Sequence, residues 1–278
     1  MNPRAVAAWS AACLTIVLTT TNPGYRLAVL ASTVAVLVAS AGARRARRPL
    51  LAGAVAALLS AAFNFVLSHL GADVLFSVPE WVPAIGGPYT LEAAVFGVTA
   101  GITLAAAVLA VAPLAMLLEP DQVVDALPGF LHGSGAAVAA ALNLVPSLGR
   151  TFTAVADAQR LRGWRPRGPR SWSEVVVPVV LTAIEDSIQL AESMAARGFG
   201  SGPRTRLEPP RMTATDWLTV ATAGAAAAIF VGCVLAGAVA DWDAYPSLRP
   251  PALAPLPAAA CLLPALPGVW WRSPRWPA

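Results

Sequence analysis

Charge is scarce in this chain, and lysine is absent. Only 12% of the 278 residues are charged, against about 25% in an average soluble domain, and all 19 basic residues are arginine. Hydrophobic residues make up 57% of the chain, and the mean hydropathy is +0.64. A soluble globule cannot bury that much apolar surface. The composition therefore excludes a disordered chain and an ordinary soluble enzyme, and it indicates a polytopic membrane protein.

The chain is also poor in residues that carry chemistry. Its three cysteines, Cys13, Cys233 and Cys261, lie in apolar stretches without C-x-x-C spacing, which argues against a disulfide framework or a zinc site. Its two histidines, His69 and His132, are too far apart in the expected topology to share a metal ion. No H-E-x-x-H, G-x-S-x-G or Walker glycine loop occurs. We therefore expect no enzyme, no catalytic residue, no metal site and no cofactor bound by this chain.

Long apolar runs, by contrast, are abundant. Six of them approach the roughly 20 residues that a helix needs to cross a hydrocarbon core of about 30 Å. They predict an all-α polytopic membrane protein with about six transmembrane helices and a cytoplasmic insertion of amphipathic coupling helices. The last run contains four prolines, which predict a kinked or broken helix. The runs are residues 5–21, 27–43, 50–70, 93–118, 218–240 and 252–271.

The arginines predict the orientation of these helices. With six spans and a cytoplasmic N-terminus, all but two of the 19 arginines fall on the cytoplasmic side, as the positive-inside rule requires. The exceptions are Arg26 and Arg249. We therefore expect a multi-pass protein of a bacterial cell membrane with both termini in the cytoplasm. Its expected parts are transmembrane helices 1–4 in residues 1–118, a cytoplasmic coupling-helix region in 119–215, and transmembrane helices 5 and 6 in 216–278.

The cytoplasmic region predicts amphipathic helices. A short helix is expected after Glu119. A longer one is expected to begin near Pro146, because proline suits a first turn, and to end at Gly163 in a left-handed conformation. Another is expected to begin by Pro178 and to end at Arg197-Gly198, with an apolar stripe spaced by three and four residues. That stripe comprises Val177, Val180, Leu181, Ile184, Ile188, Ala191 and Ala195.

The ends of the two longer helices repeat one pattern: alanine, an acid, four residues, Arg-Gly and an aromatic residue. The pattern occupies residues 156–164 and again 191–199. Arginine in the last turn followed by glycine is ordinary helix termination, and this remains one interpretation. The duplication favours a second interpretation, in which each end presents a fork-shaped guanidinium to an acidic groove. Two equivalent ends then suggest two equivalent receptors.

At these residues the chain resembles the transmembrane T component of energy-coupling factor (ECF) transporters, the CbiQ family. That family is marked by two Ala-Arg-Gly motifs on cytoplasmic coupling helices. The second motif is intact at Ala196-Arg197-Gly198, and the first reads Leu161-Arg162-Gly163. The segments Asn22-Pro23-Gly24-Tyr25-Arg26 and Thr90-Leu91-Glu92 are also similar to the family and occur in its order. The resemblance covers most of residues 22–240, whereas the first helix and the proline-rich end match less well.

The resemblance implies a mechanism and partners. Such a T component joins two ATP-binding cassette ATPase subunits, or one fused chain, to a membrane-embedded S component that binds a vitamin or metal ion for uptake. ATP and magnesium would be bound by the ATPases, and the chain would contact the lipid bilayer but no nucleic acid. By this carry-over the ATPase-docking residues are Arg162, Gly163, Ala196, Arg197 and Gly198, with supporting positions Asp157, Ala158, Trp164, Glu192 and Phe199.

Two other functions stay open from the residues alone. A self-sufficient permease is expected to carry ionisable residues inside its spans, and none of the six runs has one near its middle. An integral membrane enzyme is the less favoured alternative, because the catalytic motifs named above are missing.

Overall fold

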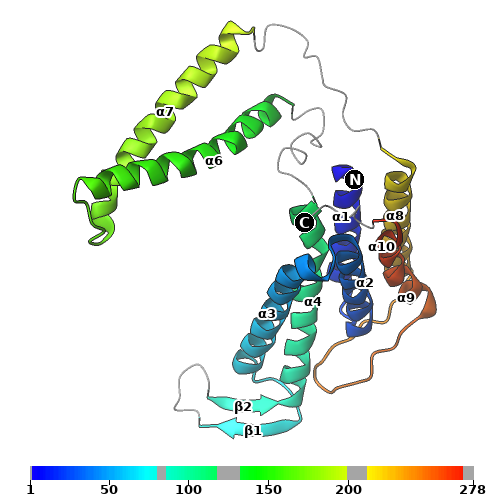
Figure 1. The fold of residues 1–278 in the computed structure, drawn as a ribbon. Helices are drawn as coiled ribbons and strands as arrows, with labels where there is room; N and C mark the ends of the chain where they lie inside the picture. The colour runs from blue at the N-terminus through cyan, green and yellow to red at the C-terminus, as the bar shows by residue number, and fades with distance from the viewer. Residues whose placement is uncertain (1, 80–85, 118–131, 199–211, 272–278) are drawn as a thin grey trace. The chain divides into compact units, whose positions relative to one another are not determined.

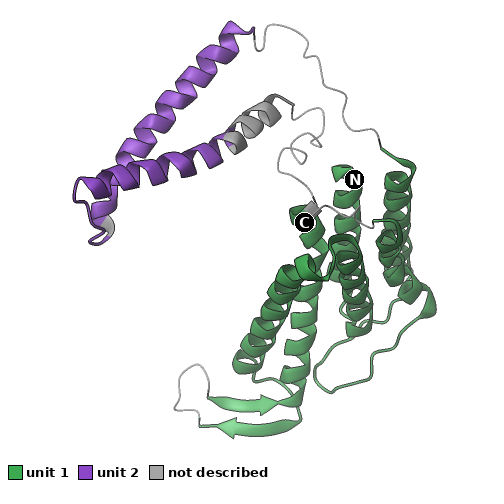
Figure 2. Ribbon diagram, viewed as in Figure 1, with its two compact units in different colours: residues 1–119, 211–278 green, residues 120–210 purple. Residues whose placement is uncertain are grey.

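The computed structural model describes residues 2–79, 86–117, 132–198 and 212–271. Its contacts divide the chain into two compact units: Met1–Glu119 with Arg211–Ala278 (unit 1), and Pro120–Pro210 (unit 2). Figure 2 shows unit 1 in green and unit 2 in purple. The described residues are mainly helical, which confirms the all-α class, but they include one β-hairpin that the sequence analysis did not predict. The short helix expected after Glu119 lies outside the described residues.

Unit 1 is a bundle of apolar helices (Figure 1). Four of its described helices are long and apolar enough to cross a membrane, and each coincides with a predicted run. The first and last predicted runs form shorter apolar helices instead, α1 (Pro3–Thr19) and the segment Pro255–Trp270. The described chain therefore has four helices of full spanning length, where the sequence predicted about six. The four are α2 (Pro23–Ala41), α3 (Ala43–Leu67), α4 (Leu91–Leu117) and α8 (Ala214–Leu235).

The two shorter segments end for local reasons. The first, α1, stops because Thr20 is extended and the side chain of Asn22 then caps α2. Prolines divide the last segment, which confirms the predicted break in the final helix. Its parts are α9 (Pro255–Leu262), the 3-10 turn η3 (Leu263–Ala265) and α10 (Pro267–Trp270).

The core of unit 1 joins the two ends of the chain. Trp9 on α1 is fully buried, its indole N–H donates to the carbonyl of Pro264 (2.8 Å), and its ring centroid lies 5.7 Å from that of Trp271. Tyr25 on α2 meets Phe230 on α8 edge-on at 5.6 Å. Aromatic pairs of this geometry contribute about 0.5–1.5 kcal/mol beyond their burial. The short terminal helices are therefore part of the bundle and not loose ends.

Two glycines allow α3 and α4 to pack closely. A Cβ atom at Gly97 would lie 2.7 Å from the carbonyl oxygen of Ala61, and one at Gly101 would lie 2.6 Å from that of Ala57. Real Cβ atoms do not approach an oxygen so closely. The two glycines are one helical turn apart, so they form the small-residue stripe that lets membrane helices come together.

A β-hairpin connects α3 to α4. Strands β1 (Val74–Val78) and β2 (Gly87–Thr90) pair in antiparallel fashion, and the rings of Phe76 and Tyr89 stack at 4.7 Å. The buried carboxylate of Glu92, at the start of α4, accepts hydrogen bonds from the backbone N–H groups of Ala72 and Asp73 (3.1 Å each). Glu92 thus holds the turn between α3 and the hairpin.

Unit 2 is a pair of helices that diverge from a tight connection as the arms of a V (Figure 1). These are α6 (His132–Leu161) and α7 (Ser173–Ala196), and the 3-10 turn η2 (Pro169–Trp172) comes just before α7. The predicted start near Pro146 is wrong, whereas α7 begins at Ser173 and has therefore begun by Pro178, as predicted. Each helix begins earlier and continues through its proline.

Proline is tolerated inside α7 because α6 replaces the lost hydrogen bond. Pro178 has no N–H to donate to the carbonyl of Glu174, four residues before it. The side-chain amide of Gln159 on α6 donates to that carbonyl instead (3.1 Å). In α6 the alanine-rich sequence before Pro146 favours a helix, which extends the helix towards its N-terminus.

Candidate functional site

The two repeated helix ends are built alike. At the end of α6 the N–H of Gly163 donates to the carbonyl of Arg160 (3.0 Å), and the N–H of Trp164 donates to that of Gln159 (2.9 Å). This pair of bonds defines a Schellman cap, with Arg162 at the C-cap position and Gly163 just past it. At the end of α7 the N–H of Gly198 makes the equivalent bond to the carbonyl of Ala195 (2.9 Å).

Both glycines have the conformation that such a cap requires. Gly163 has φ +89° and Gly198 has φ +73°, so the predicted left-handed stops are confirmed. Residues with a side chain rarely adopt these angles. The sequence repeat is therefore also a structural repeat, in which Arg162 and Arg197 hold the same C-cap position.

The arginines themselves are not explained by these caps. Both side chains are exposed, and neither makes a hydrogen bond or ion pair with another residue in the ranges that the structure describes. A Schellman cap uses backbone groups only, and any residue with ordinary angles serves at the C-cap. The favourable effect of a cation on a helix C-terminus is about 0.3–1 kcal/mol and does not need arginine. The guanidinium groups are thus available to a partner.

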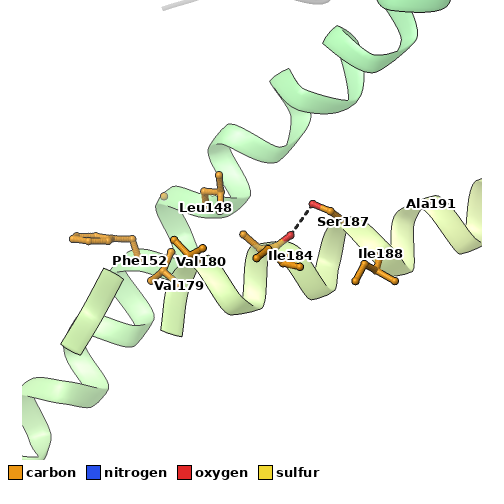
Figure 3. Close-up of a pocket in the computed structure, with 10 residues that line it drawn as sticks. Leu148, Phe152, Val179, Val180, Ile184, Ser187, Ile188 and Ala191 are labelled. Carbon is orange, nitrogen blue, oxygen red and sulfur yellow. Dashed lines mark hydrogen bonds between the residues drawn. The ribbon is translucent and has the colours of Figure 1, made fainter. Parts of the chain in front are cut away.

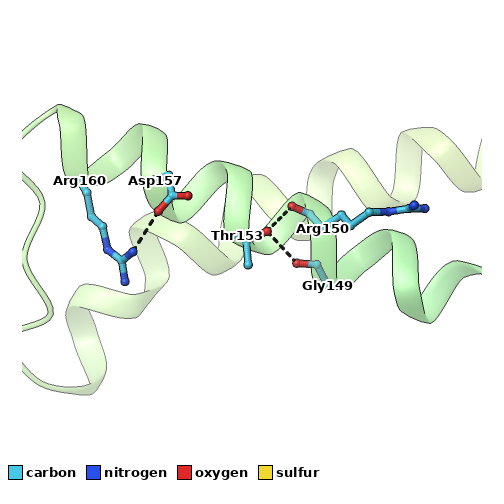
Figure 4. Close-up of polar contacts among 5 residues, drawn as sticks. All are labelled: Gly149, Arg150, Thr153, Asp157 and Arg160. Carbon is cyan, nitrogen blue, oxygen red and sulfur yellow. Dashed lines mark hydrogen bonds and ion pairs between the residues drawn. The ribbon is translucent and has the colours of Figure 1, made fainter. Parts of the chain in front are cut away.

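The acidic residues of the two repeats differ in their surroundings. Asp157 forms an ion pair with Arg160 on the next turn (2.9 Å), on the polar face of α6 that also carries Arg150 and Thr153 (Figure 4). Glu192 on α7 has alanine at the position equivalent to Arg160. Both members of the Asp157 pair are exposed, so the pair contributes little to stability.

The aromatic residue that follows the first Arg-Gly belongs to the interior of unit 2. Trp164 is buried, and its indole N–H donates to the carbonyl of Ser171 (2.9 Å). Its ring meets that of Trp172 edge-on at 5.4 Å. Trp164 packs with the buried side chains of Val175 and Val179 on α7. It therefore fixes the connection that presents Arg162, while Phe199, its counterpart in the second repeat, lies outside the described residues.

One exposed residue beside this site was not singled out from the sequence. The side chain of Leu161 is 91% exposed and directly precedes Arg162. It occupies the position where the first motif departs from Ala-Arg-Gly. That departure in the sequence could have drawn attention to Leu161. In the second motif the equivalent residue is Ala196, the last residue of α7. Ala158, the remaining supporting position, is exposed on α6.

The two arginine ends lie at opposite ends of one helix. Arg162 lies at the start of the connection between α6 and α7, and Arg197 directly follows the last residue of α7 (Figure 1). A helix rises about 1.5 Å per residue, so α7, whose 24 residues lie between the two arginines in the chain, is about 36 Å long. No single small ligand bridges such a distance, so any contacts that the two ends make are separate from one another.

An apolar groove runs between α6 and α7 (Figure 3). Its volume is about 730 Å³, and Leu148 and Phe152 line it from α6. From α7 it is lined by part of the predicted apolar stripe, including Val180, Ile184 and Ile188, which are each about half exposed. The stripe therefore remains largely uncovered among the described residues. Val175 and Val179, which the predicted stripe did not include, are the α7 residues buried in a cluster with Ala156 of α6.

Other side chains that could carry chemistry are dispersed in the described part of the chain. The described residues contain no group of three His, Cys, Asp or Glu side chains that could hold a metal ion, and the three cysteines are free and buried. Charged residues in the described helices of unit 1 all lie within their first two turns, as Arg26 does in α2, Glu92 in α4 and Asp216 in α8. These helices therefore carry no line of ionisable groups of the kind that a substrate path requires.

Comparison with known families identifies the chain. The family model described as cobalt transport protein, CbiQ, matches residues 1–208. The chain belongs to the CbiQ family. This is the family of the T components of ECF transporters, so the resemblance inferred from the motifs is confirmed, and the chain is a membrane protein of a transport family. A comparison with curated proteins finds no significant match.

The extent of the CbiQ match differs from that expected. The match includes α1, which the motifs had suggested lies outside the resemblance, and both Arg-Gly ends. It stops before α8, which the motifs had suggested lies inside. The helices that close the bundle of unit 1 on the C-terminal side, α8 to α10, thus fall outside the matched residues.

Proposed function

We propose that this CbiQ-family chain is the T component of an ECF-type importer. In this proposal Arg162 and Arg197 each dock into an acidic groove of one cytoplasmic ATP-binding cassette ATPase, either two subunits or two halves of a fused chain. The observation that carries the proposal is that the helix caps need the glycine at each end but not the arginine beside it. The caps account for Gly163 and Gly198, whereas nothing in the described chain accounts for the two free guanidinium groups.

Arginine suits such a contact for physical reasons. Its planar fork forms two parallel hydrogen bonds with a carboxylate, and it keeps its charge when water is removed. Truncating one partner of a buried, hydrogen-bonded ion pair typically costs about 2–5 kcal/mol. The exposed side chain of Leu161 adds apolar area beside Arg162. The two docking sites would therefore have similar polar contacts but different apolar ones.

The groove between α6 and α7 supplies the second half of the proposal. Its exposed apolar residues fit a membrane-embedded partner, which we propose is the S component that binds the transported vitamin or metal ion. ATP and magnesium would be bound by the ATPases, since no phosphate-binding glycine loop occurs in this chain. The unit would thus pass the closure of the ATPases on to the S component. The proposed location is the bacterial cell membrane, with both termini and unit 2 in the cytoplasm.

The test is co-purification of the ATPases with the full-length chain in detergent. The variants are Arg162→Glu, Arg197→Glu and the double substitution, and Arg150→Glu on α6 is the matched control. Arg150 is also exposed, but it lies outside the repeat, about 18 Å along the helix from Arg162. We expect each single reversal to weaken ATPase binding, the double reversal to abolish it, and the control to bind like the wild type.

Two results would overturn the proposal. One is the absence of any ATPase from the wild-type preparation when the ATPases are co-expressed. The other is full binding by a double variant whose circular dichroism and gel-filtration profile match the wild type. In that case the Arg-Gly ends are helix caps only, and a self-sufficient permease becomes the better assignment.

A further inference from the structure

A cavity in unit 1 differs in character from the groove in unit 2. Its volume is about 460 Å³, within the range of pockets that hold small ligands, and residues of α1, α2, α3, α4 and the loop after α8 line it. Along α4 it follows one face from Phe96 to Ala107, a length of about 16 Å at 1.5 Å per residue. Its two charged residues, Arg26 and Asp243, come from the first turns of α2 and from the loop. The cavity is thus charged at one end and mostly apolar along its length, where Ser60, Thr99 and Thr103 add hydroxyl groups.

The guanidinium of Arg26 has no partner among the described residues. Its Nε atom is buried without a hydrogen-bond partner, and the guanidinium forms no ion pair among the described residues. Arg26 as a whole is only partly buried, but an Nε–H group buried without a partner is costly, so it is expected to meet an acceptor that is not part of the chain. The acceptor must reach the cavity that Arg26 lines.

The neighbouring hydroxyl groups can also bind a polar ligand. Thr99 and Thr103 donate to backbone carbonyls of α4 (2.9 Å each), which leaves their oxygen lone pairs free to accept. The hydroxyl of Thr21 accepts the backbone N–H of Trp242 (3.1 Å). This bond fixes the loop that carries Asp243 to the segment between α1 and α2. The lining of the cavity therefore offers donors in the guanidinium of Arg26, and acceptors in the carboxylate of Asp243 and the hydroxyl oxygens of α4.

We propose that this cavity binds a zwitterionic phospholipid whose headgroup carries a phosphate and a primary ammonium. The phosphate pairs with Arg26, the ammonium with the carboxylate of Asp243, and an acyl chain lies along α4 towards Leu104 and Ala107. One positive and one negative residue match such a headgroup, whereas an anionic headgroup without an ammonium leaves Asp243 facing like charge. The helices that line the cavity include spans long enough to cross the bilayer, from which a lipid enters sideways.

The test is lipid binding to the delipidated full-length protein by native mass spectrometry. The probes are phosphatidylethanolamine and phosphatidylglycerol with identical acyl chains, and glycerophosphoethanolamine, which has the headgroup without the chains. We expect the wild type to prefer phosphatidylethanolamine and to bind the soluble headgroup poorly. Arg26→Gln lowers affinity for both lipids about tenfold or more, since a charge-assisted hydrogen bond is lost. Asp243→Asn removes the preference between the two lipids.

Two further variants make the result decisive. Arg249→Gln removes an arginine that lines a neighbouring cavity but not this one, so it is expected to bind like the wild type. Ala107→Trp fills the apolar end without touching the charged end and lowers lipid affinity even if Arg26→Gln fails to fold. The proposal is wrong if the wild type does not distinguish the two lipids, or if Ala107→Trp binds them unchanged. Equal binding of the soluble headgroup assigns the cavity to a water-soluble phosphate ester and equally rejects the lipid.

Discussion

Arg162 and Gly163 are adjacent, but they have separate physical tasks. The glycine ends α6 by adopting a positive φ angle. The side chain of the arginine is exposed and has no partner in the described chain. Stability and docking are therefore expected to respond to different substitutions. This separation can be measured without any partner protein.

We predict that Gly163→Val destabilises the end of α6, whereas Arg162→Gln does not. A β-branched residue held at φ +89° costs about 1–3 kcal/mol, while an exposed substitution without contacts changes stability by about 0.5 kcal/mol or less. The measurement is hydrogen exchange of the last amides of α6 by mass spectrometry. Faster exchange in Arg162→Gln would mean that the arginine is itself part of the cap.

At the scale of elements, the hydrogen bond from Gln159 to Glu174 explains why α7 contains Pro178 without ending. We predict that Gln159→Leu destabilises the joint between α6 and α7 by about 1 kcal/mol, because the carbonyl of Glu174 loses its donor. Pro178→Ala restores the N–H, so Gln159→Leu is expected to cost much less in the Pro178→Ala background. A double-mutant cycle of thermal unfolding in detergent checks this coupling. Equal costs in both backgrounds would remove Gln159 from this explanation.

The contact between α3 and α4 gives a second prediction for an element. Gly101→Val places a side chain against the carbonyl of Ala57, and overpacking of this kind costs about 1–3 kcal/mol. Gly224→Val on α8 is the matched control, since a Cβ there meets no atom within 4 Å. We expect the thermal unfolding midpoint to fall for Gly101→Val only. A similar fall in both variants would point to lost helix flexibility and not to the α3–α4 contact.

Helix ends were easier to predict from this sequence than helix starts. Gly163 and Gly198 reveal the ends because a left-handed residue is a local requirement. Pro146 misled the prediction of a start because the alanine-rich sequence before it is already helical. The β-hairpin was missed because a strand is defined by pairing with another segment, and the short segment Val74–Val78 does not reveal its partner by sequence alone. Among the candidate site residues, the sequence alone proposes both arginines through the repeat, but the burial of Trp164 follows from tertiary packing with α7.

At the scale of the whole molecule, the distribution of arginine predicts the topology. We expect a cysteine at Ser171 in unit 2 to react with a membrane-impermeant maleimide only in inside-out vesicles, and a cysteine at Asp243 only in right-side-out vesicles. The background is a variant without Cys13, Cys233 and Cys261, which are buried. Reaction of both positions from the same side would reject the proposed orientation of unit 2.

The length of α7 has a mechanical consequence for the proposed transporter. A continuous helix of 24 residues keeps its length of about 36 Å, so we expect α7 to hold the two arginine ends apart while the ATPases close. If the two ATPases approach one another while each stays bound to one end, a helix of fixed length between them has to change its orientation. The closing stroke of the ATPases would then become a rotation of α7, and the apolar groove along its side would sweep through an arc.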